Sequence, residues 1–126
     1  MSHAPPPPRR PDASTPRVSI VLLTRNAGPD LDRVLDGIDA QNDVPPFEVI
    51  AIDTESTDGT LERLARHGVR VERITKREFS HPGTRNLGVR LARGTLVVML
   101  VQDAIPLHRR WLANLIAPLR PVVQVS

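Results

Sequence analysis

A six-residue run over residues 18–23 is rich in β-branched and aliphatic side chains and shows no alternation of apolar and polar residues. Such a run is typical of a strand that is buried on both faces, as in a parallel sheet. Three further strands are expected at residues 47–52, 69–74 and 96–101. Because parallel strands need long crossover connections, the segments between these runs must cross the sheet. The four runs therefore predict an α/β fold.

Apolar residues recur at helical spacing in the segments between the expected strands. Leu31, Val34, Leu35 and Ile38 form one such face, which ends at the break over residues 42–46. The other expected helices run from Leu61 to Gly68, from Pro82 or Gly83 to Gly94, and over residues 109–117. The pattern predicts an open, mainly parallel sheet with flanking helices, in which ligands bind at the carboxyl ends of the strands.

Length and composition favour one domain. The 126 residues are 40% hydrophobic and 25% charged, which suits a single modest core. Residues 1–16 contain six prolines, and we expect them to form a disordered tail. The folded domain is expected over residues 17–120, followed by an irregular end at residues 121–126.

Composition disfavours several classes of function. The absence of cysteine excludes disulfides and thiolate zinc sites, and no apolar run approaches the roughly 20 residues of a membrane span. A cytoplasmic location is therefore expected. The net charge is only +3, the basic residues are dispersed, and aromatic residues make up 2%, so nucleic-acid binding is disfavoured. Anionic small molecules and membrane-associated acceptors remain open.

Polar residues follow each expected strand, where the carboxyl ends of parallel strands would meet. They are Thr24-Arg25-Asn26, Asp53, Phe79-Ser80-His81-Pro82-Gly83-Thr84-Arg85-Asn86-Leu87-Gly88, and Gln102-Asp103. Asp103 is placed to hold a divalent cation that bridges phosphate oxygens, although an aspartate before Pro106 can equally form a turn. The guanidinium of Arg85, in the first turns of a helix, can bind two phosphate oxygens, although an exposed helix arginine is the alternative.

Other polar positions have both binding and structural interpretations. Asp53 can accept hydrogen bonds from a base or a ribose. Ser56, Asp58 and Thr60 are expected to cap the following helix instead of touching a ligand. His81 can contact a phosphate or simply lie exposed in a loop. Asp53 therefore suggests that a nucleotide binds beside the phosphate-binding site that Arg85 and Asp103 suggest.

With these motifs in this order, residues 18 to about 119 resemble the amino-terminal half of family 2 glycosyltransferases, which have the GT-A fold. The marks are Val18-Ser19-Ile20-Val21, Thr24-Arg25-Asn26, Asp53-Thr54-Glu55-Ser56-Thr57-Asp58-Gly59-Thr60, Gly83-Thr84-Arg85-Asn86-Leu87-Gly88 and Gln102-Asp103. The resemblance implies that Thr24, Asn26 and Asp53 hold the nucleotide. It also implies that Arg85 reaches the diphosphate and that Asp103 binds Mg²⁺ or Mn²⁺. The family's usual acidic partner of this aspartate is replaced by Gln102, which lowers the negative charge there.

The activity implied by the resemblance is inverting transfer of a sugar from a nucleoside diphosphate to an acceptor hydroxyl. The segments Phe79-Ser80-His81 and Gln102-Asp103 look like the rhamnosyltransferase branch, although Pro82 stands where glycine is expected. A hexosyl or rhamnosyl donor of the uridine or thymidine type is therefore expected. Lipid-linked molecules and polysaccharides are the candidate acceptors.

No carboxylate follows Asp103, so no catalytic base can be assigned, and we expect the chain to be truncated, with a sheet incomplete at its C-terminal side. Open sheet edges would favour a homo-oligomer. The alternative is a non-catalytic nucleotide-binding module or a decayed fragment, so the sequence leaves enzymatic activity open. A flavodoxin-like or response-regulator-like domain is disfavoured, because it would ordinarily offer a fifth strand and a phosphate loop or acidic pocket after the first strand.

Overall fold

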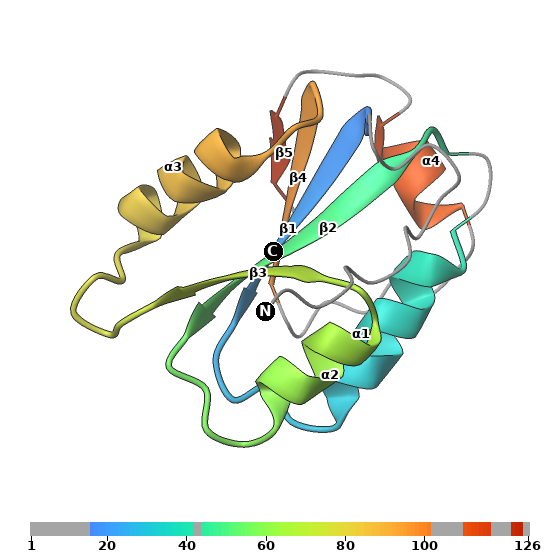
Figure 1. Ribbon diagram of the computed structural model, residues 1–126. Coiled ribbons are helices and arrows are strands. Elements are labelled where there is room, and N and C mark those ends of the chain that lie inside the picture. Colours follow the sequence, from blue (N-terminus) through green and yellow to red (C-terminus); the bar gives the residue numbers. More distant parts are fainter. Residues whose placement is uncertain (1–15, 42–43, 102–109, 117–121, 125–126) are drawn as a thin grey trace, which may run out of the picture.

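The chain folds as an open parallel sheet with helices on both faces (Figure 1). The computed structural model describes residues 16–41, 44–101, 110–116 and 122–124. Its strands are β1 (Val18–Thr24), β2 (Phe47–Thr54), β3 (Arg70–Ile74), β4 (Leu96–Val101) and β5 (Val122–Gln124). Their order across the sheet is β3-β2-β1-β4-β5, and all neighbouring strands are parallel. The expected α/β class is confirmed.

The register of the central strand determines which residues meet at the carboxyl edge of the sheet. Thr24 at the end of β1 pairs with Asp53 of β2, and Leu23 pairs with Val101 of β4. Strands β1, β2 and β4 therefore end side by side. This is the edge at which ligands bind in open α/β sheets.

Helices α1 (Asp30–Asp39), α2 (Thr60–Arg66) and α4 (Trp111–Ile116) cover one face of the sheet, and α3 (His81–Leu91) covers the other (Figure 1). The predicted apolar face of α1 is the face that packs. Its four aliphatic residues are fully buried, and each contributes roughly 1.5–3 kcal/mol through the removal of apolar surface from water. Leu64 of α2 and Leu112 of α4 join the same core.

The core beneath α3 is smaller. It contains Val21, Ile52, Val97 and Met99 from the sheet, with half-buried residues of α3 packed against them. The helix begins at His81 because Ser80 is an effective N-cap: its hydroxyl accepts a 3.1 Å hydrogen bond from the amide of Gly83. Pro82 fits the first turn, where its missing N–H removes no helical bond.

Some expected boundaries are wrong. Residues 121–126 were expected to be irregular, but Val122–Gln124 forms β5 and pairs with β4. The fifth strand also removes one of the two grounds for disfavouring a flavodoxin-like fold. Pro16 was assigned to the disordered tail, yet it is buried, whereas residues 1–15 lie outside the described residues. α3 begins one residue before Pro82 and ends at Leu91 instead of reaching Gly94.

Within the described part of the chain, no helix combines the length and the apolar character needed to span a bilayer.

Candidate functional site

Two loops at the carboxyl edge of the sheet are tied together by hydrogen bonds. The first loop (residues 25–29) follows β1, and the second loop (residues 55–59) follows β2. The side-chain oxygen of Asn26 accepts a 2.8 Å bond from the amide of Thr57, and the amide of Asn26 donates a 2.8 Å bond to Ser56 Oγ. Asn26 and Glu55 both have positive φ, at 46° and 48°. A left-handed backbone at non-glycine residues is uncommon and often marks a functional loop.

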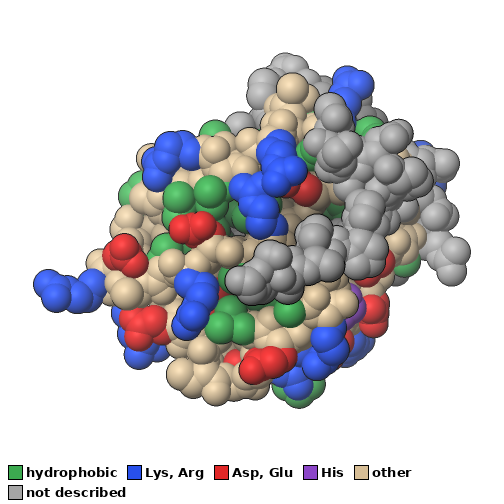
Figure 2. All heavy atoms as spheres, in the orientation of Figure 1, with side chains coloured by type: hydrophobic (Ala, Val, Ile, Leu, Met, Phe, Trp, Pro, Cys, Tyr) green, Lys and Arg blue, Asp and Glu red, His purple; other side chains and the backbone are tan. Residues whose placement is uncertain are grey.

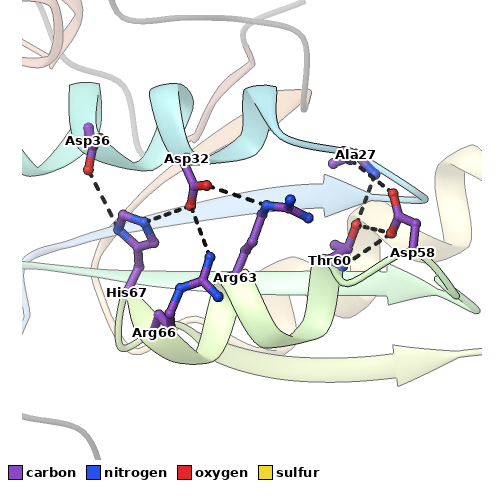
Figure 3. A network of polar contacts seen from close by, with 9 residues as sticks. Ala27, Asp32, Asp36, Asp58, Thr60, Arg63, Arg66 and His67 are labelled. Atoms are coloured by element: carbon purple, nitrogen blue, oxygen red, sulfur yellow. Dashed lines mark hydrogen bonds and ion pairs between the residues drawn. The ribbon is translucent and has the colours of Figure 1, made fainter.

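Asp58 and Thr60 strengthen this connection (Figure 3). Asp58 Oδ2 accepts a 3.0 Å bond from the amide of Gly28, and Thr60 Oγ1 accepts a 3.0 Å bond from the amide of Ala27. The Thr60 hydroxyl in turn donates a 2.6 Å bond to Asp58, which holds the pKa of that carboxyl below its ordinary value. The amides of Thr60 and Gly28 act in the same direction. The expected helix-capping role is therefore only part of what these side chains do, since they also join the two loops.

Asp53 lies fully buried at the centre of this arrangement. Its Oδ1 accepts hydrogen bonds from the hydroxyls of Thr24 at 2.7 Å and Ser56 at 2.6 Å, and its Oδ2 accepts a 3.0 Å bond from the amide of Ser56. A buried carboxylate requires such donors, because an unpaired charge away from water is costly. Asp53 thus fixes the end of β1 and the start of the second loop in one position.

A cleft of about 280 Å³ opens beside these loops. It is lined by Leu23, Thr24, Arg25, Thr54, Lys76, Phe79 and His81. These residues come from the ends of β1 and β2, from the first loop, from the third loop (residues 75–80) and from the start of α3. The cleft therefore lies at the edge of the sheet where the fold predicts a ligand.

The third loop is held against the second. Glu55 Oε2 accepts a 2.7 Å hydrogen bond from the amide of Lys76, which brings this lysine to the cleft wall. Within the loop, Thr75 and Glu78 bond reciprocally, each side chain accepting from the amide of the other. The ring of Phe79, 36% exposed, meets the ring of His81 edge-on at 5.1 Å between centroids.

The lining of the cleft combines apolar surface with positive charge. Arg25 and Lys76 are cationic, and none of the described residues that line the cleft is a carboxylate. Elsewhere the charge is mixed, and Figure 2 shows basic and acidic side chains interspersed over one face of the molecule. A cleft of this character favours an anionic ligand with an apolar or aromatic part.

The residues proposed from the sequence occupy different places in this site. Thr24 lines the cleft. Asn26 and Asp53 do not line it, and their side chains instead hold the loops together. Arg85 is exposed on α3, one turn beyond His81, and does not line the cleft. Asp103 lies outside the described residues.

Arg25, Lys76 and Phe79 were not assigned to the site from the sequence alone, and Thr54 was also missed. Lys76 is the only lysine of the chain and closely follows β3. Residues that follow parallel strands collect at one edge, so this signal could have identified it.

A second group of titratable side chains lies between α1 and α2, at the end of α2 remote from Thr60 (Figure 3). Asp32 pairs with Arg63, Arg66 and His67, with closest N···O distances between 3.2 and 3.8 Å. On its other side, the His67 ring faces the carboxylates of Asp36 and Asp39 at 3.9 and 3.7 Å. This group joins the two helices and does not contribute to the cleft.

Comparison with known proteins identifies the family of this chain. The family model described as Glycosyl transferase family 2 matches residues 19–121, most of the chain. Over 102 residues the chain is 31% identical to the O-antigen chain rhamnosyltransferase RfbN of Salmonella typhimurium (strain LT2). That alignment covers 79% of this chain and 32% of the relative.

Two solved structures have a similar fold. The mannosyltransferase PcManGT from Pyrobaculum calidifontis, in complex with GDP-Man and Mn²⁺, is 30% identical with a TM-score of 0.67, over 80% of this chain and 31% of that one. Glucosyl-3-phosphoglycerate synthase from Mycobacterium tuberculosis, in complex with Mn²⁺, UDP and glucosyl-3-phosphoglycerate, is 25% identical with a TM-score of 0.64, over 94% and 46%. The chain spans less than half the length of each of these proteins. By its fold, and by a family match over most of its length, the chain belongs to glycosyltransferase family 2.

Proposed function

We propose that this chain is the donor-binding part of an inverting glycosyltransferase and holds a nucleoside diphosphate sugar in its cleft. The observation that carries the proposal is the cleft at the carboxyl edge of the sheet, where Arg25, Lys76 and His81 surround an otherwise largely apolar hollow. Its volume of about 280 Å³ suits the nucleoside portion of the donor, with the sugar extending beyond it. The GDP-Man and UDP complexes of the related enzymes support this choice of ligand.

The cleft residues would divide the recognition of such a ligand. The proton of the Thr24 hydroxyl is committed to Asp53, so Thr24 Oγ1 is left to accept a hydrogen bond from a base or ribose. Phe79 offers an aromatic surface to the base. Lys76 and Arg25 would balance the charge of the diphosphate, with Arg85 available on the exposed side of α3.

A divalent cation, Mg²⁺ or Mn²⁺, would be held by Asp103. Val101, the last residue of β4, pairs with Leu23 of the cleft lining, and Gln102 and Asp103 come next in the sequence. Carboxylate and amide oxygens are hard ligands that suit either cation. When bound, the cation would supply positive charge to the diphosphate leaving group.

The transferred sugar is proposed to be a rhamnosyl or other hexosyl group, and the acceptor a hydroxyl of a lipid-linked molecule or a polysaccharide. The similarity to an O-antigen chain rhamnosyltransferase supports both choices. Uridine and thymidine diphosphates are the nucleotides to test first.

Isothermal calorimetry on the folded chain tests the proposal. UDP and thymidine diphosphate should bind more tightly with Mn²⁺ than without it, and Asp103→Asn should remove that difference. Arg85→Ala should weaken binding, whereas Arg90→Ala, which removes an exposed arginine at the other end of α3, should not. If neither nucleotide produced heat at millimolar concentration, the donor-site assignment would be wrong. Binding without any sugar transfer would favour a nucleotide-binding module.

A further inference from the structure

A polar network at the amino ends of the strands is centred on Glu48, the second residue of β2. Glu48 Oε2 accepts hydrogen bonds from the Ser19 hydroxyl at 2.6 Å and the Arg93 amide at 2.8 Å. Glu48 Oε1 accepts one from the guanidinium of Arg70 at 3.2 Å. The Glu48 side chain is only 12% exposed, so these bonds are partly shielded from water. We call these four residues the Glu48 network.

The Glu48 network holds the carboxyl end of α3. The second arm of the Arg70 guanidinium donates a 2.6 Å hydrogen bond to the carbonyl oxygen of Leu91, the last residue of the helix. Ala92, the C-cap residue after the helix, is extended, so the left-handed cap that usually satisfies terminal carbonyls is not formed there. The Ser19 hydroxyl also accepts a 2.8 Å bond from the amide of Gly94. Side chains from β1, β2 and β3 therefore fix the end of α3.

Apolar packing alone holds α3 weakly compared with α1. Only Thr84 and Gly88 of α3 are buried, and the leucines that pack against the sheet, Leu87 and Leu91, are only partly buried. The helix approaches the sheet closely at Gly88, where a Cβ atom would lie 2.8 Å from Cγ1 of Val21. α3 thus rests on the sheet at Gly88, and the contacts at Leu91 determine how it tilts about that point.

Because α3 contacts the sheet at Gly88, near its carboxyl end, a small tilt about this contact moves its amino end further than its carboxyl end. From Gly88 to Leu91 the helix rises about 4.5 Å, and from Gly88 back to His81 it rises about 10 Å, at 1.5 Å per residue. A displacement at Leu91 is therefore roughly doubled at His81, which lines the cleft. Misplacing an interacting group by about 1 Å can cost a large factor in function, so small movements at the network matter.

We propose that Glu48 and Arg70 are positioning residues for the diphosphate side of the cleft, acting at a distance through α3. The inference rests on the proposed nucleotide-binding function and adds to it a determinant at the amino ends of the strands. Neither side chain lines the cleft, and both act by holding the carboxyl end of α3, so that His81 and Arg85 keep their places. On the base side of the cleft, Thr24 is held by its hydrogen bond to Asp53 and does not depend on this tether.

The test compares the affinity for UDP with that for UMP, which has the same nucleoside but one phosphate fewer. Arg70→Met should weaken UDP binding about tenfold, as loss of an outer supporting contact does elsewhere, with less than about a twofold effect on UMP. Glu48→Gln should act in the same direction. Arg73→Met is the matched control, because it removes an exposed arginine from the same strand. Equal loss of both affinities, or no loss of either, would overturn the proposal.

Hydrogen exchange provides a ligand-independent readout and separates this inference from the proposed function. Arg70→Met should speed exchange of the α3 amides and leave those of α1 unchanged. Unchanged exchange in α3 of Arg70→Met would contradict the inference even if no nucleotide binds. Faster exchange in Arg70→Met, together with a wild-type chain that binds no nucleotide, would refute the proposed function and leave the tether of α3 in place. If Arg70→Met does not fold, Arg70→Lys serves instead. The single ammonium of a lysine cannot bridge Glu48 and Leu91 as the two guanidinium nitrogens of Arg70 do. Arg70→Lys should therefore also weaken UDP binding more than UMP binding, but by a smaller factor than Arg70→Met.

Discussion

The hydroxyl of Thr24 donates a 2.7 Å hydrogen bond to the buried carboxylate of Asp53, across the last paired residues of β1 and β2. Thr24 is 3% exposed and Asp53 is fully buried, so water does not replace either partner readily. Because Asp53 also accepts from Ser56, one carboxylate determines the position of a cleft residue and of the loop that follows β2.

Thr24→Val should lower the free energy of unfolding by about 1.5–3 kcal/mol, because it leaves a buried charge with one donor fewer. Urea denaturation measures the change. Thr24→Ser is the matched control, since it keeps the hydroxyl and loses only a methyl group. If the serine variant lost as much stability as the valine variant, the Thr24–Asp53 bond would not be the cause.

Asp58 should make the connection between the first and second loops sensitive to acid. Its pKa is lowered from an ordinary value of 3.8, chiefly by the hydrogen bond from the Thr60 hydroxyl. The folded state therefore holds this proton less tightly than the unfolded state, so the stabilisation is present above pH 4 or so and is lost as the pH falls through the lowered pKa.

Thermal unfolding followed from neutral pH down to about pH 3 measures this effect. Asp58→Asn should make the melting temperature fall less steeply at acid pH than it does in the wild type. Glu72→Gln, which removes an exposed carboxylate from β3, should leave the fall of the melting temperature at acid pH unchanged. If the melting temperature fell equally steeply in Asp58→Asn and in the wild type, the lowered pKa of Asp58 would not be the cause of the acid sensitivity.

The sequence predicted the elements that have a strong period. The apolar face of α1 and the uninterrupted strand at β1 are visible because burial imposes spacing on the residues themselves. β5 was missed because three residues after Pro121 carry no periodicity, and its formation depends on the free edge of β4. Such pairing is a tertiary effect that local sequence does not encode.

The site was predictable where a residue directly ends a strand, as Thr24 does. Lys76 follows β3 closely enough to be expected at this edge, but the approach of the third loop to the second depends on the hydrogen bond between the Glu55 carboxylate and the Lys76 amide, 21 residues apart. No local pattern reports such a contact. Asp53 shows the converse limit, since the sequence places it at the sheet edge but does not reveal that its oxygens are already bonded within the protein.

Gly88→Ala should destabilise the fold although alanine is the better helix former. The added Cβ would lie 2.8 Å from Val21 Cγ1 and 3.4 Å from Met99 Cε, and overpacking of this kind costs about 1–3 kcal/mol against the roughly 1 kcal/mol gained in helix propensity. A double-mutant cycle with Val21→Ala measures the contact. The second substitution makes room, so the pair should be less destabilising than the sum of the single changes. Simple additivity would show that the close approach is relieved elsewhere.

Lys76→Met should weaken nucleoside diphosphate binding about tenfold, equivalent to about 1.4 kcal/mol, because it removes a positive charge from the cleft and keeps most of the side-chain stem. Calorimetry at low and at high salt measures both the affinity and its salt dependence, which should become shallower when the charge is removed. Arg77→Met is the control, since Arg77 is the exposed neighbour and does not line the cleft. If both variants lost affinity equally, the overall charge of the third loop, and not a contact made by Lys76 in the cleft, would attract the ligand.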